Sequence, residues 1–203
     1  MQITATFVHQ RKFMILPIVA YGDPVLKKVA EEIDKDYPGL QQLIADMFET
    51  MYNANGVGLA APQIGKSIRL FIVDASPFAE DDEDGENEHL KDFKKVFINP
   101  IIEDETGEEW GFNEGCLSIP GIREEVFREE KIKISYYDEN FNFFEEEYDG
   151  FAARVIQHEY DHIEGVLFTD KISPLRRRLL KRRLEEITIG DVDVNYKMRF
   201  PKK

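Results

Sequence analysis

The sequence predicts an α+β fold, in which antiparallel or mixed β-sheets pack around a central helix and a further helix lies near the C-terminus. Segments with strand character dominate residues 67–148, and helical segments follow from residue 150 onward. Strands grouped before helices are typical of α+β proteins rather than of repeated β-α-β units. With 203 residues, of which 42% are hydrophobic, the chain 1–203 suits a single domain with its own core.

The first predicted helix covers residues 37–55. Asp36 can cap its start, and Asn55-Gly56 favours its end. Residues 56–65 are too rich in glycine to continue the helix, so their backbone can approach another group closely. The apolar residues that recur at helical spacing are Leu40, Leu43, Ile44, Met47, Phe48, Met51 and Tyr52.

Four segments have the β-branched and aromatic composition of strands. They are residues 67–74, 95–102, 131–137 and 142–148, the last with its acidic residues facing water. Between the first two, residues 80–88 hold seven acids in nine positions, which indicates a solvated, mobile loop.

The last third of the chain is predicted to be helical. Asp149 is the expected N-cap of a helix over residues 150–164. Ser173 and Pro174 open a second helix over residues 174–187, by the preference for serine at the N-cap and proline at the first helical position. Beyond Gly190 the pattern supports no firm prediction.

Charge and composition narrow the functional classes. The net charge of −14 disfavours direct binding to DNA, and no run approaches the roughly 20 apolar residues of a membrane helix. A single cysteine suggests a reducing compartment, so we expect a cytoplasmic protein. Met1 and Met14 are alternative natural starts, and with Met14 residues 1–13 would be an upstream extension.

The strongest chemical pattern is the His-Glu-x-x-His spacing within residues 157–162. On a helix, His158 and His162 lie on one face about 6 Å apart, so both imidazoles can reach one metal ion. Glu159 is one residue further round, within reach of a water at the metal. Two exposed histidines on an acidic helix are the alternative, but the chain has only four histidines. The sequence therefore predicts that the central helix binds metal.

A catalytic metal usually has a third protein ligand, and the residues alone leave its identity open. One metalloprotease pattern would place a histidine where this chain has Phe168, which cannot bind a metal. Another takes a carboxylate from a later helix, where Glu185 or Glu186 could serve. The remaining candidate is Cys116, which follows the flexible Gly115.

Three motifs in this chain resemble those of a known family. Residues 56–63, 114–118 and 157–162 match, in order and type, the signature motifs of peptide deformylases. The resemblance covers roughly residues 15–188, and the acidic stretch near 80–88 lies outside the family pattern. It implies an enzyme that removes the formyl group from the N-terminal formyl-methionine of nascent polypeptides and releases formate.

The resemblance also implies the roles of individual residues. It selects Cys116 over the late glutamates as the ligand beside His158 and His162, with Fe(II) as the native metal and Zn, Ni or Co as replacements. Glu159 would take a proton from water and pass it to the departing amine. Donors to the formyl oxygen would be the Gln63 side chain and the Leu117 backbone N–H.

Substrate contacts follow from the same resemblance. The peptide would pair with an exposed backbone edge, and its methionine would enter an apolar pocket, although the pocket residues would equally pass as plain core. An arginine would flank the peptide. The residues implied are Val57, Gly58, Gly115, Arg123, Phe151 and Val155.

The basic C-terminal end suggests a second partner. Residues 171–203 hold eleven Lys or Arg against four Asp or Glu. Related enzymes use such a helix to bind the ribosome, although a solvated helix face would look the same. The residues concerned are Arg176, Arg177, Arg178, Lys181, Arg182 and Arg183. A metalloprotease using Glu185 or Glu186, or a non-catalytic binder of N-termini, are the alternative functions.

Overall fold

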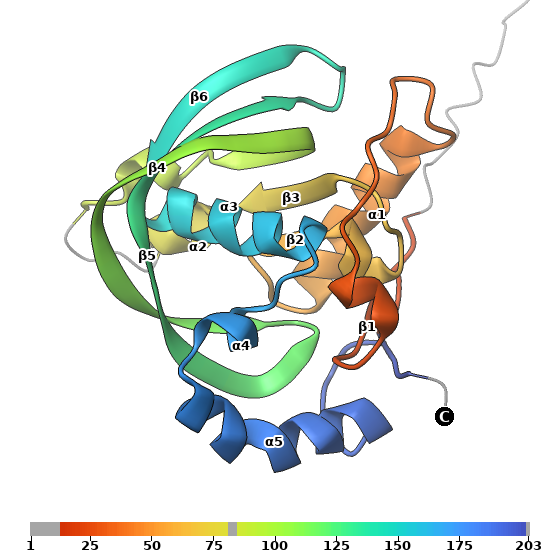
Figure 1. Ribbon diagram of the computed structural model, residues 1–203. Coiled ribbons are helices and arrows are strands. Elements are labelled where there is room, and N and C mark those ends of the chain that lie inside the picture. Colours follow the sequence, from red (N-terminus) through yellow and green to blue (C-terminus); the bar gives the residue numbers. More distant parts are fainter. Residues whose placement is uncertain (1–12, 81–84, 202–203) are drawn as a thin grey trace, which may run out of the picture.

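A computed structural model of the chain describes residues 13–80 and 85–201 (Figure 1). A five-stranded antiparallel sheet has the strand order β2-β3-β4-β5-β6, and a separate two-stranded sheet pairs β1 with β7. Helix α3 lies in the hollow of the larger sheet, and α5 lies below it in Figure 1. The predicted α+β fold is therefore confirmed. Within the described residues, no helix is both long and apolar enough to span a membrane.

The larger sheet is built around one long hairpin. Its strands are β2 (Gly58–Ala60), β3 (Leu70–Asp74), β4 (Lys94–Cys116), β5 (Ile119–Tyr137) and β6 (Phe143–Asp149). Register shifts at four places in the β4–β5 pairing bend this hairpin, which curves round α3 (Figure 1).

The four predicted strands all coincide with observed strands, but those predicted at 95–102 and 131–137 are much shorter than β4 and β5. Residues 103–109 are almost all exposed, so they lack the alternation by which a half-buried strand is recognised. On β6 the acids do not all face water, because Glu146 turns inward and accepts hydrogen bonds from Tyr136, Tyr148 and Lys95.

Helix α3 (Gly150–Ile163) occupies the predicted position. Its buried face packs against β2, β3 and β5, where Ala152, Ala153 and Ile156 join one of the main hydrophobic clusters. Asp149 is the N-cap residue as predicted, although its side chain makes no capping hydrogen bond.

Helix α1 (Leu40–Asn53) is shorter than predicted. It begins after Gly39, which has a φ of 72°, so Asp36 is not its cap. The chain makes a turn at residues 34–37 instead, where the Asp36 N–H donates to the Asp34 carboxylate at 2.9 Å. The apolar face of α1 packs into the core as expected, apart from Tyr52, which is 40% exposed.

Shorter elements complete the fold. Helix α2 (Ser76–Glu80) and a 3-10 helix (Glu88–Leu90) flank the acidic stretch, so both ends of the predicted loop are helical; its centre, 81–84, lies outside the described residues. The predicted extension 1–13 also lies outside them, except for the exposed Phe13. Two further 3-10 helices cover Pro24–Lys27 and Ala61–Ile64.

The two ends of the described chain meet beside the larger sheet. Strand β1 (Ile18–Val19) pairs in parallel with β7 (Met198–Arg199). Between α3 and β7 lie α4 (Phe168–Lys171) and α5 (Pro174–Ile189), and the Ser173 side chain caps α5 as predicted by accepting from the Arg176 N–H. Helix α5 thus extends two residues beyond its predicted end.

Candidate active site

A cleft with a volume of about 1140 Å³ opens where β2, the tip of the β4–β5 hairpin and α3 come together. Ten of the twelve predicted site residues line it, while His162 lies deeper and Phe151 lies behind the wall. The lining residues among them are Val57, Gly58, Gln63, Gly115, Cys116, Leu117, Arg123, Val155, His158 and Glu159.

The cleft floor brings together the three candidate metal ligands. One donor atom from each of Cys116, His158 and His162 lies within 4.8 Å of the others. The Cys116 Sγ is 3.2 Å from the His162 Nε2. Cys116 is the last residue of β4, whereas both histidines project from one face of α3. The hairpin tip and the helix thus supply the soft sulfur and the two nitrogens that suit a divalent transition metal.

The two imidazoles have different surroundings. His158 Nδ1 is 2.8 Å from the Glu114 carboxylate, which leaves Nε2 to face the cleft. Burial opposes a charge on His158, but hydrogen bonds with Cys116 and Glu114 raise its pKa. Burial and the charge of His158 lower the pKa of His162, whose Nδ1 has no partner within the described chain. The lowered pKa favours the neutral form of His162, which is the form in which an imidazole can bind a metal.

Glu159 lies beside these ligands and is 4% exposed. Burial raises its pKa to about 7, which suits a group that accepts and returns a proton near neutrality. A Cβ on Gly58 would lie 2.5 Å from the Glu159 Oε1, so only glycine leaves room for this carboxyl group. The backbone of residues 56–65 was predicted to approach another group closely, and at Gly58 that group is the Glu159 carboxyl group.

The buried Glu159 Oε2 finds no hydrogen-bond partner among the described residues. Buried carboxylate oxygens are normally satisfied, so an orphan beside three ligand atoms indicates a place for a reacting group. The residues present therefore fit a bound metal ion with a proton-transferring carboxyl group next to it.

Gln63 reaches the hairpin tip from the 3-10 helix Ala61–Ile64. Its Oε1 accepts from the Ala60 N–H at 2.8 Å, which turns its amide nitrogen toward the cleft. That nitrogen lies 3.4 Å from the Cys116 Sγ and 3.4 Å from the Ser118 Oγ. The Gln63 amide N–H thus points toward the two residues on either side of Leu117, one of which is the candidate ligand Cys116.

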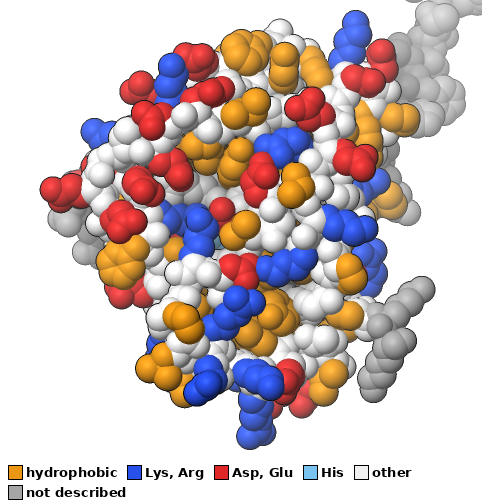
Figure 2. All heavy atoms as spheres, viewed as in Figure 1, with side chains coloured by type: hydrophobic (Ala, Val, Ile, Leu, Met, Phe, Trp, Pro, Cys, Tyr) orange, Lys and Arg blue, Asp and Glu red, His pale blue; other side chains and the backbone are white. Residues whose placement is uncertain are grey.

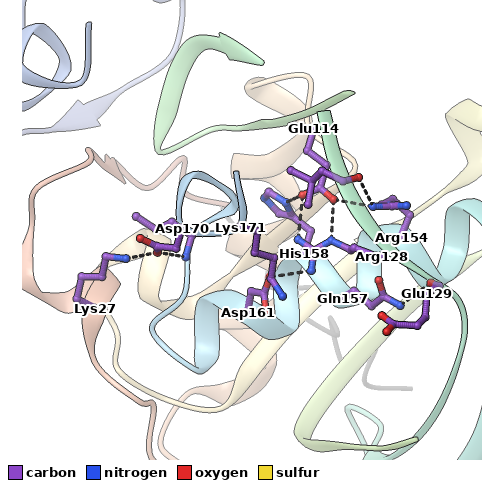
Figure 3. A network of polar contacts seen from close by, with 12 residues as sticks. Lys27, Glu114, Arg128, Glu129, Arg154, Gln157, His158, Asp161, Asp170 and Lys171 are labelled. Atoms are coloured by element: carbon purple, nitrogen blue, oxygen red, sulfur yellow. Dashed lines mark hydrogen bonds and ion pairs between the residues drawn. The ribbon is translucent and has the colours of Figure 1, made fainter. Parts of the chain in front are cut away.

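A buried ionic network supports His158 from behind, and the sequence analysis missed it (Figure 3). The Glu114 carboxylate, 3% exposed, accepts two hydrogen bonds from Arg128 at 2.7 and 2.9 Å and one from Arg154 at 3.1 Å. Burial works against its charge, but Arg128 and His158 hold the pKa of Glu114 well below its usual range. Arg154 could have been found, because it stands four residues before His158 on α3; Arg128 gives no signal in the sequence.

One wall of the cleft is aromatic. Phe78 from α2 and Phe112 from β4 line it, and neither was predicted. Phe151 does not line the cleft but stacks on Phe78 with ring centroids 4.6 Å apart. Val57 and Val155 lie on the same cleft. The cleft therefore has an apolar wall, behind which Phe151 packs on Phe78.

The alternative third ligands lie elsewhere. Glu185 and Glu186 are on α5 and pair with Lys181 and Arg182. Phe168, at the position that another metalloprotease pattern would give to a histidine, is buried in a hydrophobic cluster. A cysteine sulfur, two imidazoles and a buried carboxyl group at one cleft place the protein in the class of metal-dependent hydrolases.

Comparison with known proteins identifies the family within that class. The family model of polypeptide deformylase matches residues 15–178. The peptide deformylase of Christiangramia forsetii is 63% identical over 190 residues, covering 93% of this chain and 97% of the relative. The peptide deformylase of Flavobacterium psychrophilum is 61% identical over 193 residues, covering 94% of this chain and 100% of the relative.

A solved structure agrees. The crystal structure of a peptide deformylase from Legionella pneumophila is 40% identical, with a TM-score of 0.73, and covers 88% of this chain and 98% of that one. The chain belongs to the polypeptide deformylase family. It is a metal-dependent hydrolase that removes N-formyl groups from nascent formyl-Met polypeptides.

Proposed function

We propose that Cys116, His158 and His162 hold the metal ion of this deformylase and that Glu159 moves the proton. The observation that carries the proposal is the convergence of the three donor atoms within 4.8 Å, next to a buried carboxyl group, at the floor of the cleft. A divalent ion there supplies Lewis acidity, which makes water more acidic and a carbonyl more electrophilic.

Glu159 acts as base and then as acid. Its pKa of about 7 lets the carboxylate accept a proton from the attacking water and later release it to the amine of the departing methionine. Gly58 has no side chain, so the Glu159 carboxyl group can occupy the space that a Cβ at this position would take.

The oxygen of the formyl group gains negative charge during the attack. Gln63 Nε2, already held toward the hairpin tip, and the backbone N–H of Leu117 donate to this oxygen. Such donors stabilise the transition state by a few kcal/mol each, judged by other oxyanion holes.

The peptide binds as an added strand. Strand β2 is at the edge of the larger sheet, so backbone groups at Val57 and Gly58 can pair with an extended chain. Gly115 lies across the cleft and Arg123 stands at its rim. The methionine side chain enters the pocket lined by Val57 and Val155, with the aromatic wall behind it.

Formate release from a formyl-Met peptide, measured without oxygen, tests these roles. Glu159→Gln is expected to keep its metal and to lose at least 100-fold in kcat, the usual contribution of a general base. Cys116→Ala is expected to lose metal affinity. Glu185→Gln is the matched control, expected to behave as wild type because Glu185 only pairs with Lys181. Two outcomes would contradict the proposal. One is full turnover by Glu159→Gln. The other is that Cys116→Ala retains its metal while Glu185→Gln loses activity.

The proposal extends to the identity of the metal as Fe(II). A thiolate with two imidazoles accepts Fe(II), Zn, Ni or Co, and Fe(II)-thiolate sites are prone to oxidation. Protein purified under argon is expected to contain close to one iron per chain and to lose activity in air. Stoichiometric zinc, with activity that survives air, would point to another resident ion.

We also propose that α5 binds ribosomal RNA in the cytoplasm. Lys and Arg gather over α5 at the lower edge of Figure 2, whereas acidic side chains gather over the strands above. Arg176 and Arg177 are engaged by Glu124 and Asp170, but Arg178 has no ion-pair partner among the residues described. Its charge is therefore available to phosphate.

Co-sedimentation with ribosomes at low and high salt tests this role. Wild type is expected to bind at low salt and to dissociate at high salt, and Arg178→Glu with Lys181→Glu to bind at least ten-fold more weakly. Lys91→Glu, which reverses an exposed charge remote from α5, is the control. Equal binding by all three proteins would exclude α5 as the contact.

A further inference from the structure

The segment that follows α5 returns to the active-site cleft. Residues 193–196 line the cleft opposite α3, although the family model ends at residue 178. In Figure 1 the chain leaves the end of α5, rises toward β1 and ends at the right of the view. The cleft thus has a wall that the family match does not describe.

This segment is firmly attached on both sides of the cleft-lining residues. Gly190, with a φ of 83°, ends α5 and reverses the chain. Beyond the cleft, β7 pairs with β1, with the Ile18 N–H donating to Lys197 O at 2.8 Å and the Ala20 N–H to Arg199 O at 2.9 Å. Phe200 then packs into a hydrophobic cluster. The position of Tyr196, between these anchors, is therefore well defined.

Tyr196 contacts the turn that carries the active-site groups. Strands β4 and β5 are joined by only two residues, Leu117 and Ser118, directly after the candidate ligand Cys116. The Tyr196 hydroxyl donates to the Leu117 carbonyl at 2.8 Å. From the other chain end, the Tyr21 N–H donates to the Ser118 carbonyl at 2.8 Å. The segments that flank the two-stranded β1–β7 sheet thus present one donor to each carbonyl of the turn.

We propose that Tyr196 is a positioning residue for deformylation, which holds the Leu117-Ser118 turn so that the Leu117 N–H and the Cys116 thiolate keep their catalytic orientation. The inference rests on the role proposed above for the Leu117 N–H. A two-residue turn with a free carbonyl can rotate its peptide planes, and a small rotation redirects the neighbouring N–H. The hydrogen bond from the Tyr196 phenol, on the cleft wall, prevents this rotation.

Packing allows the hydroxyl to act separately from the ring. The Tyr196 ring is partly buried and packs against the same hydrophobic cluster as Leu117. The Leu117 side chain also lies so close to Gly56 that a Cβ there would be 2.8 Å from the Leu117 Cδ1. The Leu117 side chain is therefore packed independently of the Tyr196 hydroxyl, which bonds the Leu117 carbonyl.

Tyr196→Phe tests the inference, because it removes the hydroxyl and keeps the ring. With the zinc-loaded enzyme and a formyl-Met peptide, kcat is expected to fall roughly 10- to 100-fold with KM within about two-fold, since misplaced groups act mainly on the transition state. Amide hydrogen exchange in a fragment spanning residues 114–120 is expected to rise about ten-fold, with or without zinc. Tyr52→Phe, which removes a hydroxyl bonded to Asp74 at 2.6 Å away from the cleft, is expected to change neither.

Unchanged kcat in Tyr196→Phe overturns the inference, whether or not exchange in the turn increases. A fall in kcat with unchanged exchange in the turn overturns it as well, because the hydroxyl would then act by another route. Gln63→Leu and Glu159→Gln keep Tyr196 intact, so they test the proposed mechanism separately from the positioning role of Tyr196. Full turnover by both would refute the proposed mechanism itself, whereas loss of turnover by both with a fully active Tyr196→Phe refutes the positioning role alone.

Discussion

Two clusters of similar composition lie at opposite ends of the larger sheet. In the Glu114 cluster, a carboxylate accepts from Arg128, Arg154 and the imidazole of His158. In the Glu146 cluster, a carboxylate accepts from Lys95, Tyr136 and Tyr148. Each therefore gathers at least three donors on one carboxylate.

The clusters differ in burial and in what they contact. Glu114 is 3% exposed and touches a candidate metal ligand, whereas Glu146 is 34% exposed and bonds Lys95, Tyr136 and Tyr148, which are not among the described residues that line the cleft. A buried carboxylate is costly unless its partners are well placed, and a partner of a ligating histidine fixes the orientation of that ring. The comparison teaches that the Glu114 cluster serves the site and the Glu146 cluster serves only the sheet.

Replacing Glu114 should produce the largest effect. Glu114→Gln leaves the charges of Arg128 and Arg154 buried beside a neutral amide, and we expect a loss of about 3–5 kcal/mol in the free energy of unfolding. Because His158 loses its anionic partner, metal affinity should fall roughly 10- to 100-fold. Urea unfolding of the metal-free protein and competition with a chelator measure the two quantities. If Glu114→Gln proves as mild as Glu146→Gln, the two clusters do not differ in role.

Replacing Arg154 should separate support of the fold from support of the metal. Its guanidinium donates to the carbonyls of Trp110 at 2.6 Å and Val126 at 3.0 Å, so Arg154→Met removes a hydrogen bond from each of these acceptors. We expect a loss of about 1–3 kcal/mol in the free energy of unfolding. Metal affinity should change less than in Glu114→Gln, because Arg128 still neutralises Glu114.

Lys95→Met is the matched control for Arg154→Met, since it removes one cation from the other cluster. Lys95 is about one third exposed, and its loss should cost no more than about 1 kcal/mol. Equal destabilisation by the two substitutions would mean that burial does not distinguish the clusters. A larger loss of metal affinity in Arg154→Met than in Glu114→Gln would make Arg154, not Glu114, the main support of His158.

The same contrast explains what the sequence could reveal. The spacing of His158 and His162 predicts a shared face because it depends only on helix geometry. Glu114 and Arg128 meet through the register of a bent hairpin, in which four shifts separate sequence position from spatial position. No local pattern encodes such shifts, so the pairing of Glu114 with Arg128 could not be predicted.

The C-terminal segment is an intermediate case. Val192, Val194, Tyr196, Met198 and Phe200 alternate with exposed residues, and this period of two is typical of extended chain. The alternation could have predicted a strand beyond Gly190. It could not have predicted that the strand pairs with residues 18–19 or that Tyr196 reaches the Leu117 carbonyl, because both depend on how the chain ends meet.

Removing the charge of Glu146 should have a small effect. We expect Glu146→Gln to lower the free energy of unfolding by about 0.2–1 kcal/mol, since solvent screens its ion pair with Lys95. Formate release and metal affinity should match wild type. A loss of activity without a loss of stability would show that the sheet end is coupled to the cleft.

The smallest expected effect is the pH dependence of the difference in unfolding free energy between wild type and Glu146→Gln. Burial raises the pKa of Glu146, but hydrogen bonds from Tyr136, Tyr148 and Lys95 outweigh it and hold the pKa below its ordinary value of 4.5. A carboxyl group with a lowered pKa stabilises the fold fully above its unfolded pKa and loses this contribution as pH falls through the folded pKa. The stability difference between wild type and Glu146→Gln should therefore be constant near neutrality and shrink below about pH 4.5. Urea unfolding of both proteins between neutrality and acid measures it, and a difference that widens toward acid would mean that Glu146 does not act through its charge.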